Sequence, residues 1–283
     1  MPLLGQAFVS HGIVPEIFET SSANELGFQT SQQIHQGTRL LFAVGGDGTL
    51  QGLVNAAFGS DVVLGVVPTG GGNDFARALG LPRDPVAALV AALSGEARFV
   101  DLARVRTADG KERLYLGGGG IGLDAESARH ASTRYQNWPG RTRYIASALS
   151  AFFTRKSNCV RVTFENSKES PWRNSTLACV LNTPTFGAGI QLTPNARIND
   201  GLLDFAFLEE LRFGELLRVL PRLAIHGTLD LPKLQTMQIH KVRLETKSIA
   251  YFQGDGEILG PTPVEIEVVP NAVQFLAPKC SGT

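Results

Sequence analysis

Two glycine-rich stretches each follow an apolar run and contain residues suited to binding phosphate. Gly45, Gly46 and Gly48 surround Asp47 directly after LLFAV, and Gly70–Gly72 follow VVLGVVPT. Glycine lets the backbone approach an anion closely, and N–H groups at a helix N-terminus supply positive potential. The Asp47 carboxylate is unusual in a pure anion site and indicates either a magnesium–water shell or a helix cap. Ordinary turns at both glycine runs are the alternative.

Three acidic residues lie in later Asp-Gly turns. Asp255 and Glu257 occur in FQGDGEI, two residues apart, so an extended backbone would point both side chains to the same side. Such a carboxylate can accept the proton of a hydroxyl during phosphoryl transfer. Asp200 occurs in ARINDGLLD, where its oxygens suit a hard cation. A hairpin turn is the competing interpretation of each segment.

The segments around the glycine runs predict a doubly wound parallel sheet. RLLFAVGG and DVVLGVVPTGGG are buried strands that end in glycine, and helical spacing follows the first of them up to Gly59. Asn73 or Asp74 opens a short helix, and Asp84 caps a clearer one that ends at Gly95. Ligands of such sheets bind beyond the carboxyl ends of the strands, where both glycine runs fall.

After about residue 100 the pattern changes to β segments with period-two alternation, interrupted by two expected helices at 141–153 and 213–227. The β segments are 159–166, 175–183, 237–246, 248–258 and 263–278. We therefore expect an α/β domain over 1–100 and an antiparallel β-sandwich domain over 101–283. The last few residues are a candidate for returning to the first domain.

Composition excludes several classes of protein. The 26 Lys and Arg residues balance the 26 Asp and Glu residues, which argues against a duplex nucleic-acid binder. The three cysteines lack CxxC spacing and the five histidines are scattered, so neither a disulfide framework nor a zinc site is expected. No apolar run approaches the length of a membrane span. The motifs are also neither a Walker A loop nor a GxGxxG fingerprint.

Taken in order, the motifs resemble one family. GGDGTLQGLVN, VPTGGGNDFARALGLP, VDLARV, GIGLDAE, TPNARINDGLLD and FQGDGEI resemble the diacylglycerol kinase catalytic-domain family, especially its bacterial YegS-type lipid kinases. The resemblance implies an NAD-kinase- and phosphofructokinase-like nucleotide domain paired with a β-sandwich domain. It also implies an ATP-dependent enzyme that phosphorylates a lipid hydroxyl of diacylglycerol, phosphatidylglycerol or sphingoid-base type.

The resemblance assigns roles position by position. It implies Glu257 as proton acceptor, with Asp255 as the runner-up or as an orienting partner. It implies a magnesium loop made by the Asp200 side chain and the backbone carbonyls of Arg197 and Leu202. The implied ATP site comprises Thr20, Gly45, Gly46, Asp47, Gly48, Thr49, Leu50, Gln51 and Gly71. Two further motif positions, Asp101 and Asp124, are expected to have structural roles, and Arg77 is expected to face either phosphate or solvent.

The sequence also departs from the family pattern. Gln51 and Gly52 replace the usual Asn and Glu, and Gly71 replaces a threonine. Family members usually begin with a strand and an Asn-Pro loop that helps to hold the nucleotide, and this loop is not seen before Leu40. Either the start of the sequence is misplaced or the protein has lost the loop. Two alternatives therefore stay open: a degenerate member that binds nucleotide or lipid without turnover, and an NAD kinase. DGLLD followed by DGE speaks against the latter.

Expected partners follow from this reading. They are ATP with Mg²⁺ and a lipid substrate met at a membrane surface by peripheral, transient contact, without nucleic acid. We expect a cytoplasmic protein that is peripheral at the inner face of the membrane. Its association should be weak and transient, because neutral net charge gives no strong attraction to anionic lipids. Nothing in the sequence predicts the oligomeric state or names the lipid.

Overall fold

The computed structural model describes residues 2–122, 150, 158–165, 167, 169–187, 189–212, 214–215, 218, 227–228 and 231–279. The helices expected at 141–153 and 213–227 fall almost entirely outside these residues, as do Asp124 and Cys280. Within the described part of the chain, no helix is long and apolar enough to cross a membrane.

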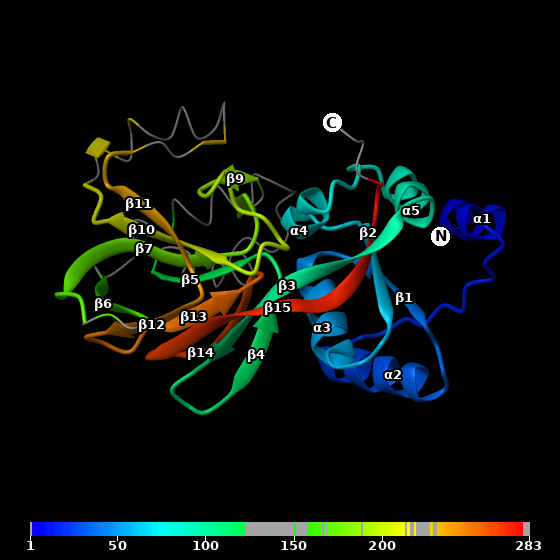
Figure 1. Ribbon diagram of the computed structural model, residues 1–283, viewed down its shortest axis with the longest axis horizontal. Helices are drawn as coiled ribbons and strands as arrows, with labels where there is room; N and C mark the ends of the chain where they lie inside the picture. Colours follow the sequence, from blue (N-terminus) through cyan, green and yellow to red (C-terminus); the bar gives the residue numbers. More distant parts are fainter. Residues whose placement is uncertain are drawn as a thin grey trace.

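The first part of the chain is an α/β unit around parallel strands. β1 (Leu40–Gly45) pairs in parallel with β2 (Val63–Pro68), and β2 pairs in parallel with the end of β15 (Val264–Ala277). The helices of this unit are α1 (Pro2–Ser10), α2 (Ala23–His35), α3 (Asp47–Ala57), α4 (Asp74–Ala78) and α5 (Pro85–Leu93). Figure 1 shows α2 and α3 on one side of β1 and β2, with α1 and α5 on the other.

Local sequence explains where these helices begin. The Asp84 side chain accepts a hydrogen bond from Ala87 N at 2.8 Å and Pro85 takes the first position of α5, as expected. Ser22 caps α2 in the same way, through Glu25 N. Neither α1 nor α2 is expected from the sequence, because neither has the clear apolar stripe that predicts α3.

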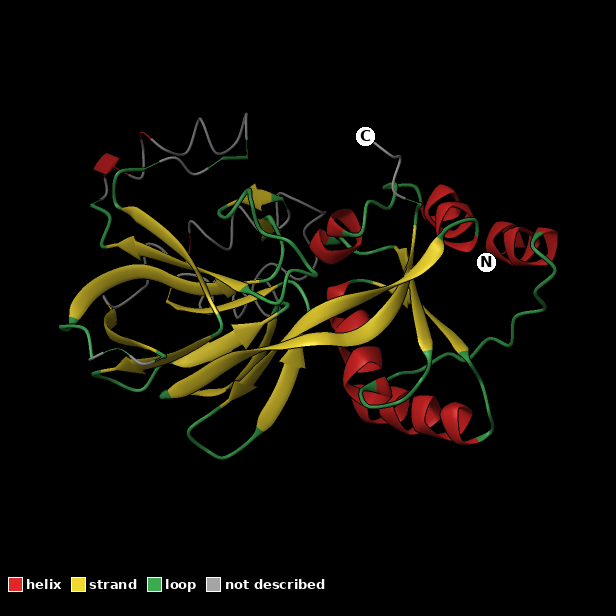
Figure 2. Ribbon diagram, in the orientation of Figure 1, coloured by secondary structure: helices red, strands yellow, loops and turns green. Residues whose placement is uncertain are grey.

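The second part is an antiparallel sandwich. Figure 2 shows it as two layers of strands beside the helical part. Its strands are β3 (Glu96–Arg106), β4 (Glu112–Tyr115), β5 (Gly118–Gly122), β6 (Asn158–Phe164), β7 (Arg173–Leu181), β8 (Thr185–Phe186), β9 (Ile190–Gln191), β10 (Leu203–Glu209), β11 (Leu234–Ile239), β12 (Lys241–Thr246), β13 (Tyr251–Gly254) and β14 (Glu257–Pro261). One expected segment, 237–246, is in fact parts of two strands that meet at His240 and pair with different neighbours. Alternation alone could not mark this break, since it continues through both strands.

Two long strands connect the parts. β3 and β15 pair with each other along most of their length and run from the α/β unit into the sandwich (Figure 1). Their register shifts between Val269 and Val273, where Pro270 lacks an N–H group and Asn271 has φ of 49°. One continuous sheet therefore passes through both parts, and the division near residue 100 stays a prediction.

Separate apolar cores lie beneath the two parts. In the α/β unit, Leu53 and Val54 of α3 pack with Leu64 of β2 and Phe275 of β15. In the sandwich, a second cluster fills the space between the layers. Its members include Tyr115, Val180, Phe205, Val242, Phe252 and Ile266. Leu102 of β3 and Leu114 of β4 also belong to the first cluster, so apolar packing joins the two parts together with backbone pairing and polar contacts.

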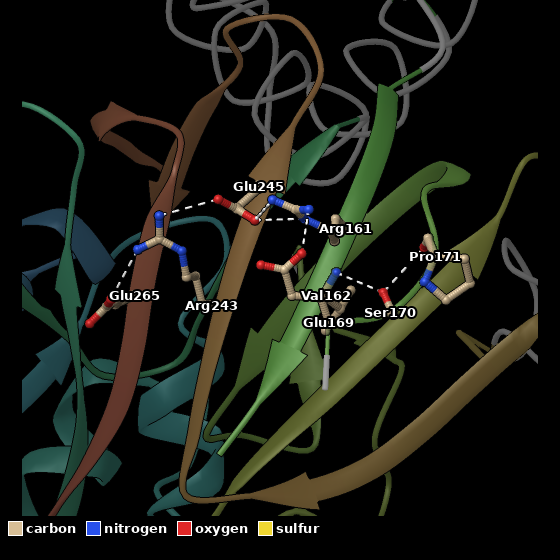
Figure 3. A network of polar contacts seen from close by, with 8 residues as sticks. All are labelled: Arg161, Val162, Glu169, Ser170, Pro171, Arg243, Glu245 and Glu265. Carbon is tan, nitrogen blue, oxygen red and sulfur yellow. Dashed lines mark hydrogen bonds and ion pairs between the residues drawn. The ribbon is translucent and has the colours of Figure 1, made fainter. Parts of the chain in front are cut away.

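An ion-pair network covers the outer face of β6, β12 and β15 (Figure 3). Glu245 lies opposite Arg161 in the strand register and also contacts Arg243, whose guanidinium reaches Glu265. Burial disfavours the charged form of Glu245, but hydrogen bonds from Arg161 and Arg243 outweigh it and lower the pKa of the carboxyl group. Cross-strand pairs of opposite charge stabilise a sheet in this position.

We expect Glu245→Gln to lower the free energy of unfolding at pH 7 by about 1 kcal/mol. Because the pKa of Glu245 is lowered in the folded protein, this stabilisation is present at neutral pH and is lost as the pH falls through the folded pKa. Urea denaturation at about pH 7 and about pH 3 would measure the difference. The exposed Glu16 provides a control variant, Glu16→Gln, and a difference that persists in acid would contradict the assignment.

Candidate active site

The two glycine loops meet at the carboxyl ends of β1 and β2. Thr69 N donates a hydrogen bond to Gly45 O at 3.0 Å. A Cβ built on Gly70 would lie 2.6 Å from Gly46 Cα, closer than real Cβ contacts allow. The loops can therefore touch only because both positions lack side chains. Adjacent parallel strands thus place two glycine runs at one edge of the sheet, where such folds bind ligands.

Asp47 lies between the loops as the first residue of α3. Its Oδ2 accepts a hydrogen bond from Asn73 N at 2.9 Å. A Cβ on Gly72 would lie 2.7 Å from the same oxygen, so glycine makes room for the carboxylate. Burial, reinforced by the charge of Asp74, raises the pKa of Asp47 to about 6 against the opposing effect of Asn73 N–H. The Asp47 carboxylate therefore connects the two loops.

A polar cluster fastens α4 to the sandwich. Arg77 Nη1 contacts Asp74 Oδ1 at 2.5 Å and Thr185 Oγ1 at 3.1 Å, and Nη2 donates to Gly72 O at 3.1 Å. Thr185 also donates to Asp74 Oδ1 at 2.7 Å. Asn73, expected as a possible cap, has φ of 54° and its side chain donates to Gly70 O at 2.6 Å. Arg77 thus connects the second glycine run to β8 through Gly72 O and Thr185, and its facing a phosphate stays a prediction.

Asp255 occupies the turn between β13 and β14. Its Oδ2 accepts a hydrogen bond from Leu116 N at 2.7 Å, and its Oδ1 accepts from Gly117 N at 2.9 Å and Gly118 N at 3.2 Å. Burial raises the pKa of Asp255 to about 7, with Asp47 contributing in the same direction and the N–H groups opposing. Both oxygens are engaged by the backbone before β5. This arrangement favours the orienting role over that of proton acceptor.

Glu257 begins β14, and its carboxylate faces the first turn of α3. A Cβ on Gly48 would lie 3.0 Å from Glu257 Oε1. The residue is exposed, and partial burial of its carboxyl group raises the pKa. The structure therefore brings Glu257, Asp47 and the glycine loops together from segments more than 180 residues apart. A solvent-accessible carboxylate beside phosphate-type loops has the geometry of a general base.

The other residues expected in the ATP site lie in different surroundings from one another. Thr49 Oγ1 packs over Gly45, where a Cβ would lie 2.6 Å away. The Leu50 side chain is 2% exposed and belongs to the core, and the Gln51 amide donates to Gly254 O at 3.2 Å. Gly71 lies in the exposed second loop, and Thr20 is half-buried in the segment between α1 and α2.

The expected magnesium loop precedes β10. Asp200 Oδ1 accepts a hydrogen bond from Leu202 N at 3.1 Å. Asp101 supports this loop: its Oδ2 accepts from Gly201 N at 2.7 Å, and its own N–H donates to Ile198 O at 2.7 Å. The structural role expected for Asp101 agrees with these bonds. The loop also contains Arg197, whose side chain is exposed.

The donor types in this loop fit a hard cation. Burial and the neighbouring Asp200 raise the pKa of Asp204 to about 6, so two carboxyl groups lie near each other. Oxygen atoms from carboxylates and carbonyls are what Mg²⁺ binds. Among the residues that the structure describes, however, no three His, Cys, Asp or Glu side chains are grouped to hold a metal. Carbonyls and water would have to complete the coordination.

Sequence reasoning missed two polar residues that build the site. Thr185 contacts α4, as described above, and Asn55 bonds both backbone groups of Leu114: Nδ2 donates to its O at 2.8 Å and Oδ1 accepts from its N at 3.0 Å. Asn55 lies eight residues after Asp47, on the same stripe of α3, which was the available signal. Thr185 carries no such signal, since its role depends on a contact across 108 residues.

Comparison with known proteins matches both parts of the chain. Residues 3–105 match the diacylglycerol kinase catalytic domain, and residues 119–277 match the YegS C-terminal NAD kinase beta sandwich-like domain. A diacylglycerol kinase of Mycobacterium tuberculosis is 31% identical over 248 residues, which cover 87% of this chain and 79% of the relative. The chain belongs to the diacylglycerol kinase and YegS-type lipid kinase family.

Other relatives agree. A probable YegS-like lipid kinase of Klebsiella pneumoniae is 30% identical over 85% of this chain and 78% of its own length. A putative diacylglycerol kinase structure from Bacillus anthracis superposes with a TM-score of 0.76 at 20% identity, covering 98% of this chain and 89% of that one. The family assignment and the fold class expected from sequence are confirmed, and with them the enzyme class, lipid kinase.

We expect Asp47→Asn to stabilise the folded protein at alkaline pH. The folded pKa of Asp47 is raised to about 6, so the ionised carboxylate destabilises the fold increasingly as the pH rises from the unfolded pKa through the folded one. An amide keeps the bond from Asn73 N without that charge, and the gain should be about 1–2 kcal/mol at about pH 8 and near zero at about pH 4.

Thermal unfolding of the two proteins across this pH range would measure the gain. A variant destabilised equally at both pH values would show that the Asp47 charge is already compensated in the fold.

Proposed function

We propose that this protein transfers the γ-phosphoryl group of ATP to a hydroxyl of a lipid, of diacylglycerol, phosphatidylglycerol or sphingoid-base type. The observation that carries the proposal is the approach of Glu257 to Gly48 on the first turn of α3, where the two glycine loops meet. This approach supports a single site that holds both the phosphates and the proton acceptor. The names of the relatives, diacylglycerol kinase and probable lipid kinase, support the same reaction.

In this proposal each element has one task. N–H groups of Gly45, Gly46 and Gly48, with the N-terminus of α3, receive the phosphates of ATP, and Gly71 leaves the second loop open to them. Thr20, Asp47 and Thr49, with the backbone of the buried Leu50, complete the nucleotide site proposed from the family. Glu257 accepts the proton of the lipid hydroxyl as the oxygen attacks the γ-phosphorus, and ADP leaves with the bridging oxygen.

Supporting groups hold that geometry. The carboxylate of Asp255 fixes the turn before Glu257 by its three backbone hydrogen bonds. Asp200, with carbonyls of Arg197 and Leu202, would hold Mg²⁺ through oxygen ligands. When bound near phosphates, Mg²⁺ neutralises the charge that develops in the transition state.

The proposal extends to the setting of the reaction. The lipid is met at a membrane surface through transient peripheral contact, and the protein works in the cytoplasm at the inner face of the membrane. A second candidate function is a degenerate member that binds nucleotide or lipid without turnover. It is favoured by the departures at Gln51, Gly52 and Gly71 from the family pattern.

Transfer of labelled γ-phosphate from ATP to a panel of lipids in mixed micelles, with and without Mg²⁺, tests the proposal. Magnesium-dependent formation of one phospholipid product is the expected result, and it would also identify the substrate. ATP binding without any lipid product would favour the degenerate alternative.

Glu257→Gln removes the proton acceptor while keeping the shape of the side chain. We expect kcat to fall by about 10²- to 10⁴-fold, with the melting temperature unchanged because the side chain is exposed. Glu165→Gln, an exposed carboxylate after β6, is the matched control and should keep full turnover. Undiminished turnover in Glu257→Gln would remove this residue from the role.

Gly48→Ala tests the spacing between the helix and the base. The added Cβ would lie 3.0 Å from Glu257 Oε1 and force the carboxylate to shift, which should lower kcat by about tenfold or more. Alanine favours helices over glycine, so the melting temperature should stay the same or rise. Steady-state kinetics and thermal unfolding together check this, and a stable variant with full activity would contradict the proposed contact.

A further inference from the structure

Gln51 makes a contact that differs from those of the loop residues before it. Its side chain lies on the second turn of α3 and is 3% exposed. Its Nε2 donates a hydrogen bond to Gly254 O at 3.2 Å, across 203 residues of sequence. Gly254 ends β13 and immediately precedes the Asp255–Glu257 turn. The bond therefore joins the helix of the glycine loop to the turn that carries the base.

The contact belongs to a polar stripe along α3. Asp47, Gln51 and Asn55 are spaced four residues apart and share one face of the helix. Asp47 contacts the second glycine loop, and Asn55 bonds the backbone of Leu114 in β4. Asn55 Nδ2 also donates to Gln51 O at 2.9 Å. Gln51 is thus the middle contact of a seam that fixes α3 along the sandwich.

The turn has a second support on its other side. Asp255 holds it to the backbone of residues 116–118, and Gly256 N donates to Gln253 Oε1 at 2.8 Å. These bonds fix the turn relative to β5 but not relative to α3. The hydrogen bond from Gln51 fixes the turn relative to α3. Gly48 lies about one helical turn before Gln51 on α3. The Gln51 hydrogen bond therefore also sets the distance between Glu257 and Gly48.

We propose that Gln51 is a positioning residue for Glu257 and that its side chain is not a ligand of the nucleotide. The inference deepens the proposed function and rests on it for the role of Glu257. The length of the Gln51 side chain matters, because asparagine keeps the amide but is one methylene shorter and would not reach Gly254 O. Methionine keeps the length but has no donor.

Hydrogen exchange without any ligand tests the tether. Amides of residues 252–258 should exchange about tenfold faster in both Gln51→Met and Gln51→Asn than in the wild type, because one buried hydrogen bond is lost. Gln32→Met makes the same chemical change on the exposed face of α2 and should leave the rate unchanged. Unchanged exchange in both Gln51 variants, with melting temperatures like the wild type, would overturn the tether.

Kinetics with ATP and the lipid identified by the transfer assay test the positioning role. Both Gln51 variants should lower kcat by about 10- to 100-fold, with KM for ATP within about threefold of the wild type. A rise in KM for ATP at constant kcat would make Gln51 a nucleotide ligand and overturn the inference. Absence of turnover in the wild type would instead refute the proposed function and the positioning role that rests on it, and exchange would still decide the tether.

Discussion

The candidate site depends on missing side chains at a few backbone positions. Gly46 and Gly70 let two loops touch, Gly72 leaves room for a carboxylate, and Gly48 lets Glu257 lie against a helix N-terminus. A Cβ on Gly70 would lie 2.6 Å from Gly46 Cα and one on Gly72 would lie 2.7 Å from Asp47 Oδ2, while one on Gly46 would make a tight contact with Gly70 Cα at 3.3 Å. The geometry of the candidate site is therefore set by close packing of backbones, which glycine permits. The hydrophobic cores serve to hold the strands whose ends carry these loops.

A second constraint is the gathering of carboxyl groups at the junction. Burial and the charge of Asp74 raise the pKa of Asp47 to about 6, and burial with the charge of Asp47 raises the pKa of Asp255 to about 7. In the ion-pair network on the sandwich the pKa shift has the opposite direction, because arginines lower the pKa of Glu245. One part of the molecule thus stores electrostatic strain near the candidate site, while another is stabilised by charge. Such a division is common where function requires an unfavourable arrangement.

The sequence was informative where local chemistry decides structure. The glycine exits of β1 and β2, the Asp84 cap and the β-hairpin around Asp255 all follow from short-range rules. Contacts between distant segments could not be predicted from the sequence. Examples are the hydrogen bond from Arg77 to Thr185 and the one from Gln51 to Gly254 O. These depend on how two parts of the chain dock, and no local pattern encodes that distance.

The proposed function requires the glycine loops and the turn carrying Glu257 to form one site. A crystal structure with Mg²⁺ and a non-hydrolysable ATP analogue would test it most directly. We expect the phosphates against Gly45–Gly48 and the second glycine run, with the terminal phosphate on the side of Glu257. A nucleotide bound elsewhere, or with its terminal phosphate turned away from that carboxylate, would contradict it.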